Sequence, residues 1–208
     1  MNQKVELVVL VADKDMDLAL QEILKRHQAV GMRPVEFQVW PHPEHDPGCL
    51  RTGHEFLRPF AGRCAHALVI FDRDGCGRQG LAHETLEEQV EQRLRESGWD
   101  DRAAAICIDP ELEAWLWSGS SEVASALGWH DRSAELRSWL MRQGLWTPKL
   151  PKPQDPKRAV REAIRQVQKP WSAQIHQHLA SRVSFRNCAD PAFGKLLLSL
   201  RRWFPPRG

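Results

Sequence analysis

Three apolar runs in this chain each end at an acidic residue, and this pattern constrains the fold more than any other feature. The runs are residues 5–12 before Asp13, 67–71 before Asp72, and 103–108 before Asp109. Apart from Glu6 the runs are continuous, and apolar runs of this length are typical of strands buried on both faces. The carboxyl ends of parallel strands form the crevice in which open α/β sheets bind ligands. The sequence therefore predicts that carboxylates far apart along the chain converge at one edge of a sheet.

The first half alternates strand-like runs with segments of helical period, in the order βαβαβαβ. Strands are expected at residues 5–12, 35–40, 66–71 and 104–108, and helices at 15–27, 50–57 and 85–96. Helical crossovers join parallel strands, so the fold class is α/β, with a four-stranded parallel sheet flanked by helices.

The second half reads as a series of helices. They are expected at residues 111–117, 121–127, 133–143, 156–168, 173–180 and 193–203. Asp109, Pro110 and Glu111 form a typical helix start, with Asp109 as the capping carboxylate. We therefore expect an α/β domain at residues 1–117 and a helical, basic, tryptophan-rich C-terminal region at 118–208.

Composition supports a folded protein with an uneven charge. The chain has 208 residues, of which 42% are hydrophobic and 27% charged, with a net charge of +2. Residues 1–109 hold 13 basic and 19 acidic residues (−6), and residues 110–208 hold 16 and 8 (+8). This favours an acidic half for a metal and a basic half for an anionic partner, although two differently charged solvated surfaces explain it equally well. No apolar run reaches the roughly 20 residues of a membrane span, so we expect a cytoplasmic protein without a membrane partner.

Four acidic residues are candidates for a divalent cation site. Asp72 and Asp74 follow a strand at a spacing that points both carboxylates the same way in an extended chain. Asp13 lies within reach of them if the first and third strands are neighbours, but Asp and Gly after a strand also form ordinary turns, and Asp13 can simply cap a helix. Glu111 is expected to support the site, whereas Glu113 is expected to point elsewhere.

A basic helix in the second half is the candidate contact for nucleic acid. Arg158, Arg161 and Arg165 recur at helical spacing opposite an apolar stripe, and guanidinium groups grip phosphates as bidentate forks. Lys14 and Lys152 complete the predicted nucleic-acid-binding set. The alternative is a face that is merely solvated. Eight of the nine tryptophans lie between residues 99 and 203, where they could stack on bases or, more conventionally, anchor a core.

The cysteines do not indicate a disulfide framework. There are five, an odd number, and no two form a C-x-x-C pair. His42, His45, Cys49 and His54 could ligate zinc, but their spacing matches no standard finger and the segment also reads as a proline-rich loop that leads into a helix.

Several motifs carry a resemblance to a known family. They are Val11-Ala12-Asp13-Lys14, Asp46-Pro47-Gly48-Cys49-Leu50, the Asp-x-Asp of Asp72 and Asp74, and Pro110-Glu111-Leu112-Glu113-Ala114-Trp115. Together with the βαβαβαβ order of elements along the chain, these motifs resemble the Toprim domain of topoisomerases, bacterial primases and related nucleases. The whole chain is most similar to small Toprim-like proteins of bacterial anti-phage defence loci, in particular a subunit of the methylation-associated defence system.

The resemblance implies a Mg²⁺-dependent (or Mn²⁺-dependent) nuclease that acts on nucleic-acid phosphodiesters within a multi-subunit defence complex. Asp72 and Asp74 match the magnesium-binding Asp-x-Asp, and Asp13 stands where Toprim proteins place a glutamate that acts as general acid or base. Aspartate is one methylene shorter, and Lys14 lies beside it. The alternative is a catalytically degenerate Toprim-like adaptor in the same kind of complex.

Overall fold

The α/β expectation is confirmed by the computed structural model, which describes residues 5–117, 121–130, 132–172, 174–182 and 190–206. The strands are β1 Leu7–Val11, β2 Phe37–Pro41, β3 His66–Asp72 and β4 Ala103–Ile108. They form one parallel sheet in the order β2-β1-β3-β4. Because β1 and β3 are neighbours, the segments that follow them meet at the same edge of the sheet.

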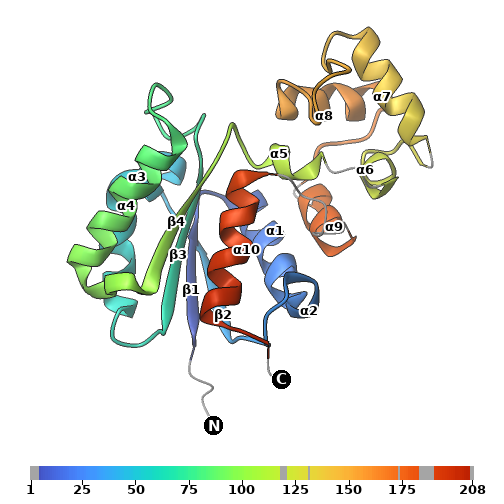
Figure 1. Ribbon diagram of the computed structural model, residues 1–208. Helices are drawn as coiled ribbons and strands as arrows, with labels where there is room; N and C mark the ends of the chain where they lie inside the picture. The colour runs from blue at the N-terminus through green and yellow to red at the C-terminus, as the bar shows by residue number, and fades with distance from the viewer. Residues whose placement is uncertain (1–4, 118–120, 131, 173, 183–189, 207–208) are drawn as a thin grey trace.

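Helices cover both faces of the sheet (Figure 1). The helices of the first half are α1 Lys14–Lys25, α2 His27–Val30, α3 His45–Leu57 and α4 His83–Leu94. Helices α3 and α4 lie on one face, against β1, β3 and β4, and α1 lies on the other. With both faces covered, all five residues of β1 are buried, which explains why its sequence is apolar throughout rather than alternating.

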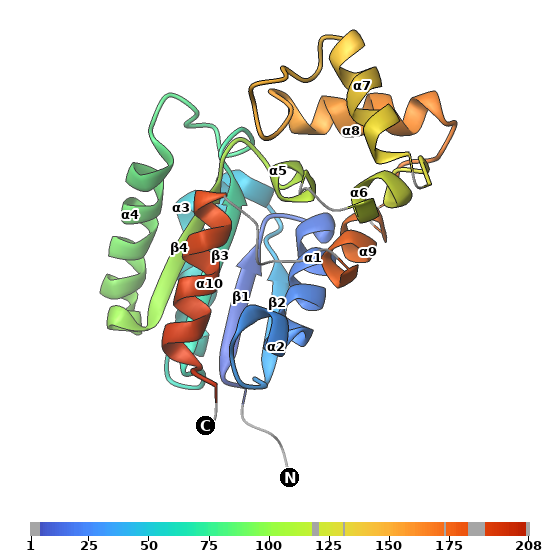
Figure 2. The ribbon, with the colours of Figure 1, turned by 45° about the vertical axis from the view of Figure 1, so that its right-hand side comes forward.

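The second half is helical, as expected, and most of it lies beyond the carboxyl edge of the sheet (Figure 2). Its helices are α5 Glu113–Leu116, α6 Ser121–Ala126, α7 Ser133–Arg142, α8 Pro156–Gln166, α9 Gln174–Arg182 and α10 Pro191–Trp203. Helix α9 packs along α1, so the helical region contacts the α/β unit at a second place besides α5.

Two hydrophobic clusters divide the interior, and their division differs from the predicted boundary at residue 117. The first contains the sheet and its helices and also Phe193, Leu196 and Leu200 of α10, which packs on β4. The second lies among α6, α7, α8 and α9. The C-terminal helix therefore returns to the α/β unit, because its apolar stripe covers a sheet face that α1 leaves open.

The expected helix start at Asp109 is wrong. Helix α5 begins at Glu113, and the Asp109 carboxylate instead accepts two hydrogen bonds from Arg73 Nη1, at 2.9 and 3.0 Å. An ion pair with Arg73, in the turn after β3, is therefore present where a helix cap was expected.

None of the described helices is long and apolar enough to cross a membrane.

Candidate carboxylate site and adjoining basic groove

The carboxylates predicted to converge do so in part, at the ends of β1 and β3. Val11, which precedes Ala12 and Asp13, pairs in register with Ile70, two residues before Asp72. Asp46, near the start of α3, joins them, because its Oδ1 accepts a 2.7 Å hydrogen bond from the backbone N–H of Asp72. Sequence reasoning did not select Asp46 as a site residue, although it lies in one of the motifs that carried the resemblance.

Asp72 is the most perturbed of these carboxylates. Its Oδ1 is buried and has no hydrogen-bond partner among the described residues. Burial raises its pKa well above the usual range, and the nearby carboxylates of Asp46, Glu113 and Asp13 raise it further. Carboxyl groups whose pKa is raised by burial and by neighbouring like charges are often found at functional sites.

Asp13 caps helix α1. Its Oδ1 accepts a 2.9 Å hydrogen bond from the backbone N–H of Met16, and its backbone is extended, as the residue before a helix normally is. Asp13 was a candidate for either a cation ligand or a helix cap, and the cap is the role that the structure shows. The carboxylate still lies close enough to influence Asp72 and Asp46, and Oδ2 is the oxygen that the cap leaves over.

Asp74 does not share the environment of Asp72. Strand β3 ends at Asp72 and the chain turns, so the alternation that would align the two side chains stops there. Asp74 is exposed and borders a groove beside Glu111 and Lys157. The predicted Asp72–Asp74 pair is thus replaced by a pairing of Asp72 with Asp46 and Glu113.

The expected roles of Glu111 and Glu113 are reversed. Glu111 Oε1 accepts from the backbone N–H of Lys157 at 3.0 Å and Oε2 from its Nζ at 3.2 Å, so both oxygens of the predicted supporting ligand are engaged. Glu113 is the carboxylate that acts on Asp72. The difference arises because helix α5 begins only at Glu113, so Glu111 precedes the helix and the two side chains are not separated by a helical turn.

Glu113 lies between two basic groups. His176 Nε2 is 3.7 Å from its Oε1, beyond hydrogen-bond distance, and Lys157 Nζ is 3.9 Å away. Burial alone would raise the pKa of Glu113, but His176 and Lys157 outweigh it and lower the pKa. Its Oε2 is buried and has no hydrogen-bond partner in the described part of the chain.

His176 is fully buried on α9 and was not selected from the sequence. Its Nδ1 is 3.8 Å from Asp15 Oδ2, so the ring stands between carboxylates of α1 and α5. A single histidine on an amphipathic helix gives no sequence signal for such a position, because the contact depends on how α9 docks on α1.

The basic residues lie beside this site, on α8. The groove that contains Asp74 and Glu111 has a volume of about 690 Å³ and is also bordered by Arg158 and Arg161. Helix α8 starts at this place because Asp155 caps it, accepting from Arg158 N at 2.9 Å, and Pro156 takes the first helical position.

Three of the predicted nucleic-acid contacts are engaged within the protein. Lys152 Nζ donates to the buried Asp190 carboxylate at 2.7 Å, so its side chain supports the fold rather than an open surface. Lys14 is exposed but pairs with Asp17. Arg165 is exposed and pairs with Glu162.

The two histidines at the start of the histidine and cysteine patch have hydrogen-bond partners within the protein. His42 accepts from Glu44 N through Nδ1 and lies 3.2 Å from the Thr52 hydroxyl through Nε2, and His45 contacts Ala12 O. Helix α3 begins at His45, earlier than expected. Throughout the described ranges, no group of three or more His, Cys, Asp or Glu side chains is arranged to hold a metal ion.

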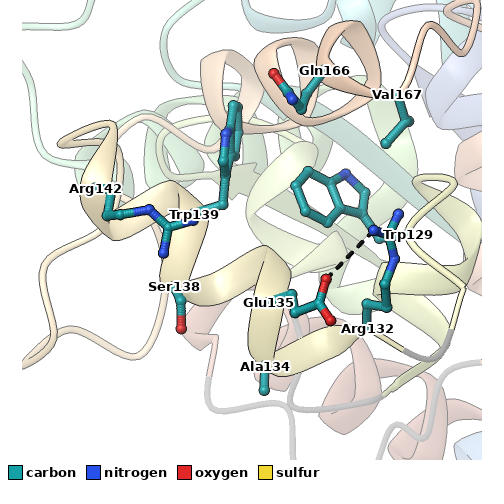
Figure 3. Close-up of a pocket in the computed structure, with 9 residues that line it drawn as sticks. All are labelled: Trp129, Arg132, Ala134, Glu135, Ser138, Trp139, Arg142, Gln166 and Val167. Atoms are coloured by element: carbon teal, nitrogen blue, oxygen red, sulfur yellow. Dashed lines mark hydrogen bonds and ion pairs between the residues drawn. The ribbon is translucent and has the colours of Figure 1, made fainter.

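A separate hollow of about 510 Å³ lies on another flank of α8, towards α7 (Figure 3). The rings of Trp129 and Trp139 border it, and Arg132 pairs with Glu135 at its rim. Trp129 is buried and donates to Ala163 O, so its main role is in the second hydrophobic cluster.

Comparison with known proteins adds no assignment. No protein-family model, curated protein or solved structure matches this chain.

The donor set suits a hard cation in its chemistry. Asp72 Oδ1 and Glu113 Oε2 are buried carboxylate oxygens with no hydrogen bond in the described structure, and water or a cation would satisfy them. Mg²⁺ usually keeps several waters and takes one or two carboxylates, so a preassembled group of three ligands is not required.

Proposed function

We propose that this protein binds a divalent cation, Mg²⁺ or Mn²⁺, at Asp72 and Glu113 and acts on phosphodiesters of nucleic acid. The observation that carries the proposal is the pair of buried carboxylate oxygens without hydrogen bonds at the carboxyl edge of the sheet. The adjoining groove, bordered by Arg158 and Arg161, supports a phosphate-bearing substrate, because guanidinium groups match phosphate oxygens.

The residues of the chain would share the work in the following way. When bound, a divalent ion would polarise a phosphoryl oxygen and lower the pKa of a water molecule. The carboxylates of Asp72 and Glu113 would bind the ion. Asp46 orients Asp72 by accepting a hydrogen bond from its backbone N–H. Asp13 Oδ2 is available to accept a proton from a water, while Arg158 and Arg161 hold the substrate phosphates beside the carboxylates.

Thermal denaturation with increasing MgCl₂ or MnCl₂ tests the cation site. At ten times its dissociation constant, a cation that binds only the folded protein adds about 1.4 kcal/mol of stability. We expect this gain in the wild type and its loss in Asp72→Asn. Asp101→Asn, an exposed acid at the other end of the sheet, is the matched control and keeps the gain. A wild type that neither cation stabilises contradicts the proposal.

Cleavage of a labelled strand separates the two roles of Asp13. Asparagine can still cap α1 but cannot take a proton, whereas alanine can do neither. We expect both Asp13→Asn and Asp13→Ala to lose cleavage, and only Asp13→Ala to lose stability. If Asp13→Asn cleaves as fast as the wild type, Asp13 is not the base.

A second candidate function is that of an adaptor with a degenerate site, in which the helical half docks a partner protein. Two observations favour it: Asp13 is used as a cap, and the described residues provide no group of three metal ligands. If Mg²⁺ and Mn²⁺ neither stabilise the protein nor support cleavage, the adaptor becomes the better proposal.

The defence role is proposed from the sequence resemblance alone. Plating of phages on cells that carry the locus with Asp72→Asn tests it. A nuclease loses protection with this change, an adaptor keeps it, and a locus that never protects contradicts both.

A further inference from the structure

We propose that helix α8 and the segment after it bind single-stranded nucleic acid, with Arg158 and Arg161 on the phosphates and Trp171 stacked on a base. This inference rests on the proposed function and names its substrate class. It depends on how two neighbouring hollows, two exposed guanidinium groups and one exposed tryptophan are arranged.

The two hollows follow one another along α8. The first, of about 690 Å³, contains Asp74 and Glu111. The second, of about 780 Å³, contains Arg165, Lys169 and Trp171. Arg161 borders both. A bound strand could therefore run from the carboxylate edge of the sheet, past Arg161, to Trp171.

Arg158 and Arg161 are the arginines along these two hollows whose guanidinium groups are available to bind phosphate. Both are exposed, and within the described residues neither guanidinium has a carboxylate at ion-pair distance. By contrast, Lys157 pairs with Glu111 and Arg165 with Glu162. Positions 158 and 161 are one turn apart on the helix, so the two forks face the same side and can hold successive phosphates.

Trp171 differs from the tryptophans that build the second core. Trp117 and Trp129 are buried, and their indole N–H groups donate to Pro156 O and Ala163 O. Trp171 is 38% exposed. Arg161 Cζ is 5.9 Å from its ring centroid, and the buried His176 ring holds it edge to face at 5.7 Å.

A ring that is fixed by its neighbours but open to solvent is a suitable platform for a base. Stacking on aromatic side chains needs an unstacked base, which a single strand offers and a duplex does not. Stacking uses only the flat face that every base has, so this platform predicts little sequence preference.

Fluorescence anisotropy in EDTA tests the proposal without involving the cation site. The probes are a labelled single strand, the corresponding duplex, and a single strand of the same length in which every base is missing. Since one stacked base contributes about tenfold in affinity, we expect the wild type to bind the ordinary strand about tenfold more tightly than the abasic strand. The duplex should bind about as weakly as the abasic strand.

Variants then assign the two parts of the surface. Trp171→Ala should lose about tenfold for the ordinary strand and nothing for the abasic one, while Trp171→Phe retains most of the affinity. Trp40→Ala removes a tryptophan that is 43% exposed on β2 and serves as the matched control. The double change of Arg158 and Arg161 to alanine should weaken all three probes and reduce the slope of log K against log salt by about 1.4 for the single strands and about 1.8 for the duplex. Arg63→Ala, at the amino end of β3, is its control.

Equal binding of the ordinary and abasic strands overturns the stacking role, and this comparison uses only the wild type. Unchanged binding by the double arginine variant overturns the phosphate path. Because every measurement is made in EDTA, a protein that binds strands but gains no stability from Mg²⁺ or Mn²⁺ fails only the proposed function. A protein that Mg²⁺ or Mn²⁺ stabilises but that does not bind single strands contradicts only this inference.

Discussion

At the scale of single residues, the carboxyl edge of the sheet holds more negative charge than the fold alone would favour. The carboxylates of Asp46, Glu113 and Asp13 lie near Asp72 and raise its pKa. Lys157 lowers this pKa, but its ammonium group is already hydrogen-bonded to Glu111. In the absence of a cation, the ionised form of Asp72 is therefore disfavoured in the folded protein.

This gives a prediction for pH dependence. The folded-state pKa of Asp72 is raised, so its contribution to stability is complete below its unfolded pKa and is lost as pH rises through the folded pKa. In EDTA at pH 8 we expect Asp72→Asn to be more stable than the wild type by about 1 kcal/mol. The difference should fall towards zero near pH 3. Chemical denaturation across this range measures it, and a variant less stable at pH 8 contradicts the assignment.

At the scale of elements, α10 is held to the sheet by a partly buried ion pair as well as by apolar contact. Lys195 Nζ lies 2.8 Å from Glu87 and 2.8 Å from Glu91 on α4. The same glutamates accept from the backbone N–H groups of Cys107 and Ala105 in β4. Burial would lower the pKa of Lys195, but the two carboxylates outweigh it and raise the pKa.

We predict that Lys195→Met destabilises the protein by about 2 kcal/mol, because Glu87 is left buried without its cation. The raised pKa of Lys195 keeps this contribution intact at neutral pH, and it is lost only as pH rises above the ordinary lysine range. The double variant Glu87→Gln with Lys195→Met should recover most of the loss. Urea denaturation at pH 7 compares the three proteins; an unaffected single variant would show that apolar packing alone holds α10.

At the scale of the whole molecule, α5 joins two hydrophobic clusters within a few residues. Trp115 belongs to the cluster of the sheet, and the next residue, Leu116, belongs to the helical cluster. Asp190 secures this junction, because its Oδ1 accepts from Trp115 Nε1 and from Phe193 N while its Oδ2 accepts from Lys152.

We predict that Asp190→Ala lowers the unfolding free energy by about 3 kcal/mol, since it removes the cap of α10 and leaves two buried donors without an acceptor. Asp190→Asn keeps the cap and should lose about half as much. Denaturation followed by tryptophan fluorescence measures both. A change below 0.5 kcal/mol in Asp190→Ala, the range of an ordinary surface substitution, would mean that the junction does not depend on this carboxylate.

The sequence by itself determined the sheet, because continuous apolar runs of β1, β3 and β4 can only be satisfied by burial on both faces, and helical crossovers make them parallel. It also placed Asp13 and Asp72 at one edge. Only the tertiary structure decided which carboxylates face Asp72, that Lys152 supports the fold, and that α10 returns to the sheet. Those outcomes depend on side-chain directions in turns and on contacts between residues 26, 38 and 108 positions apart, and a local pattern carries no information about either.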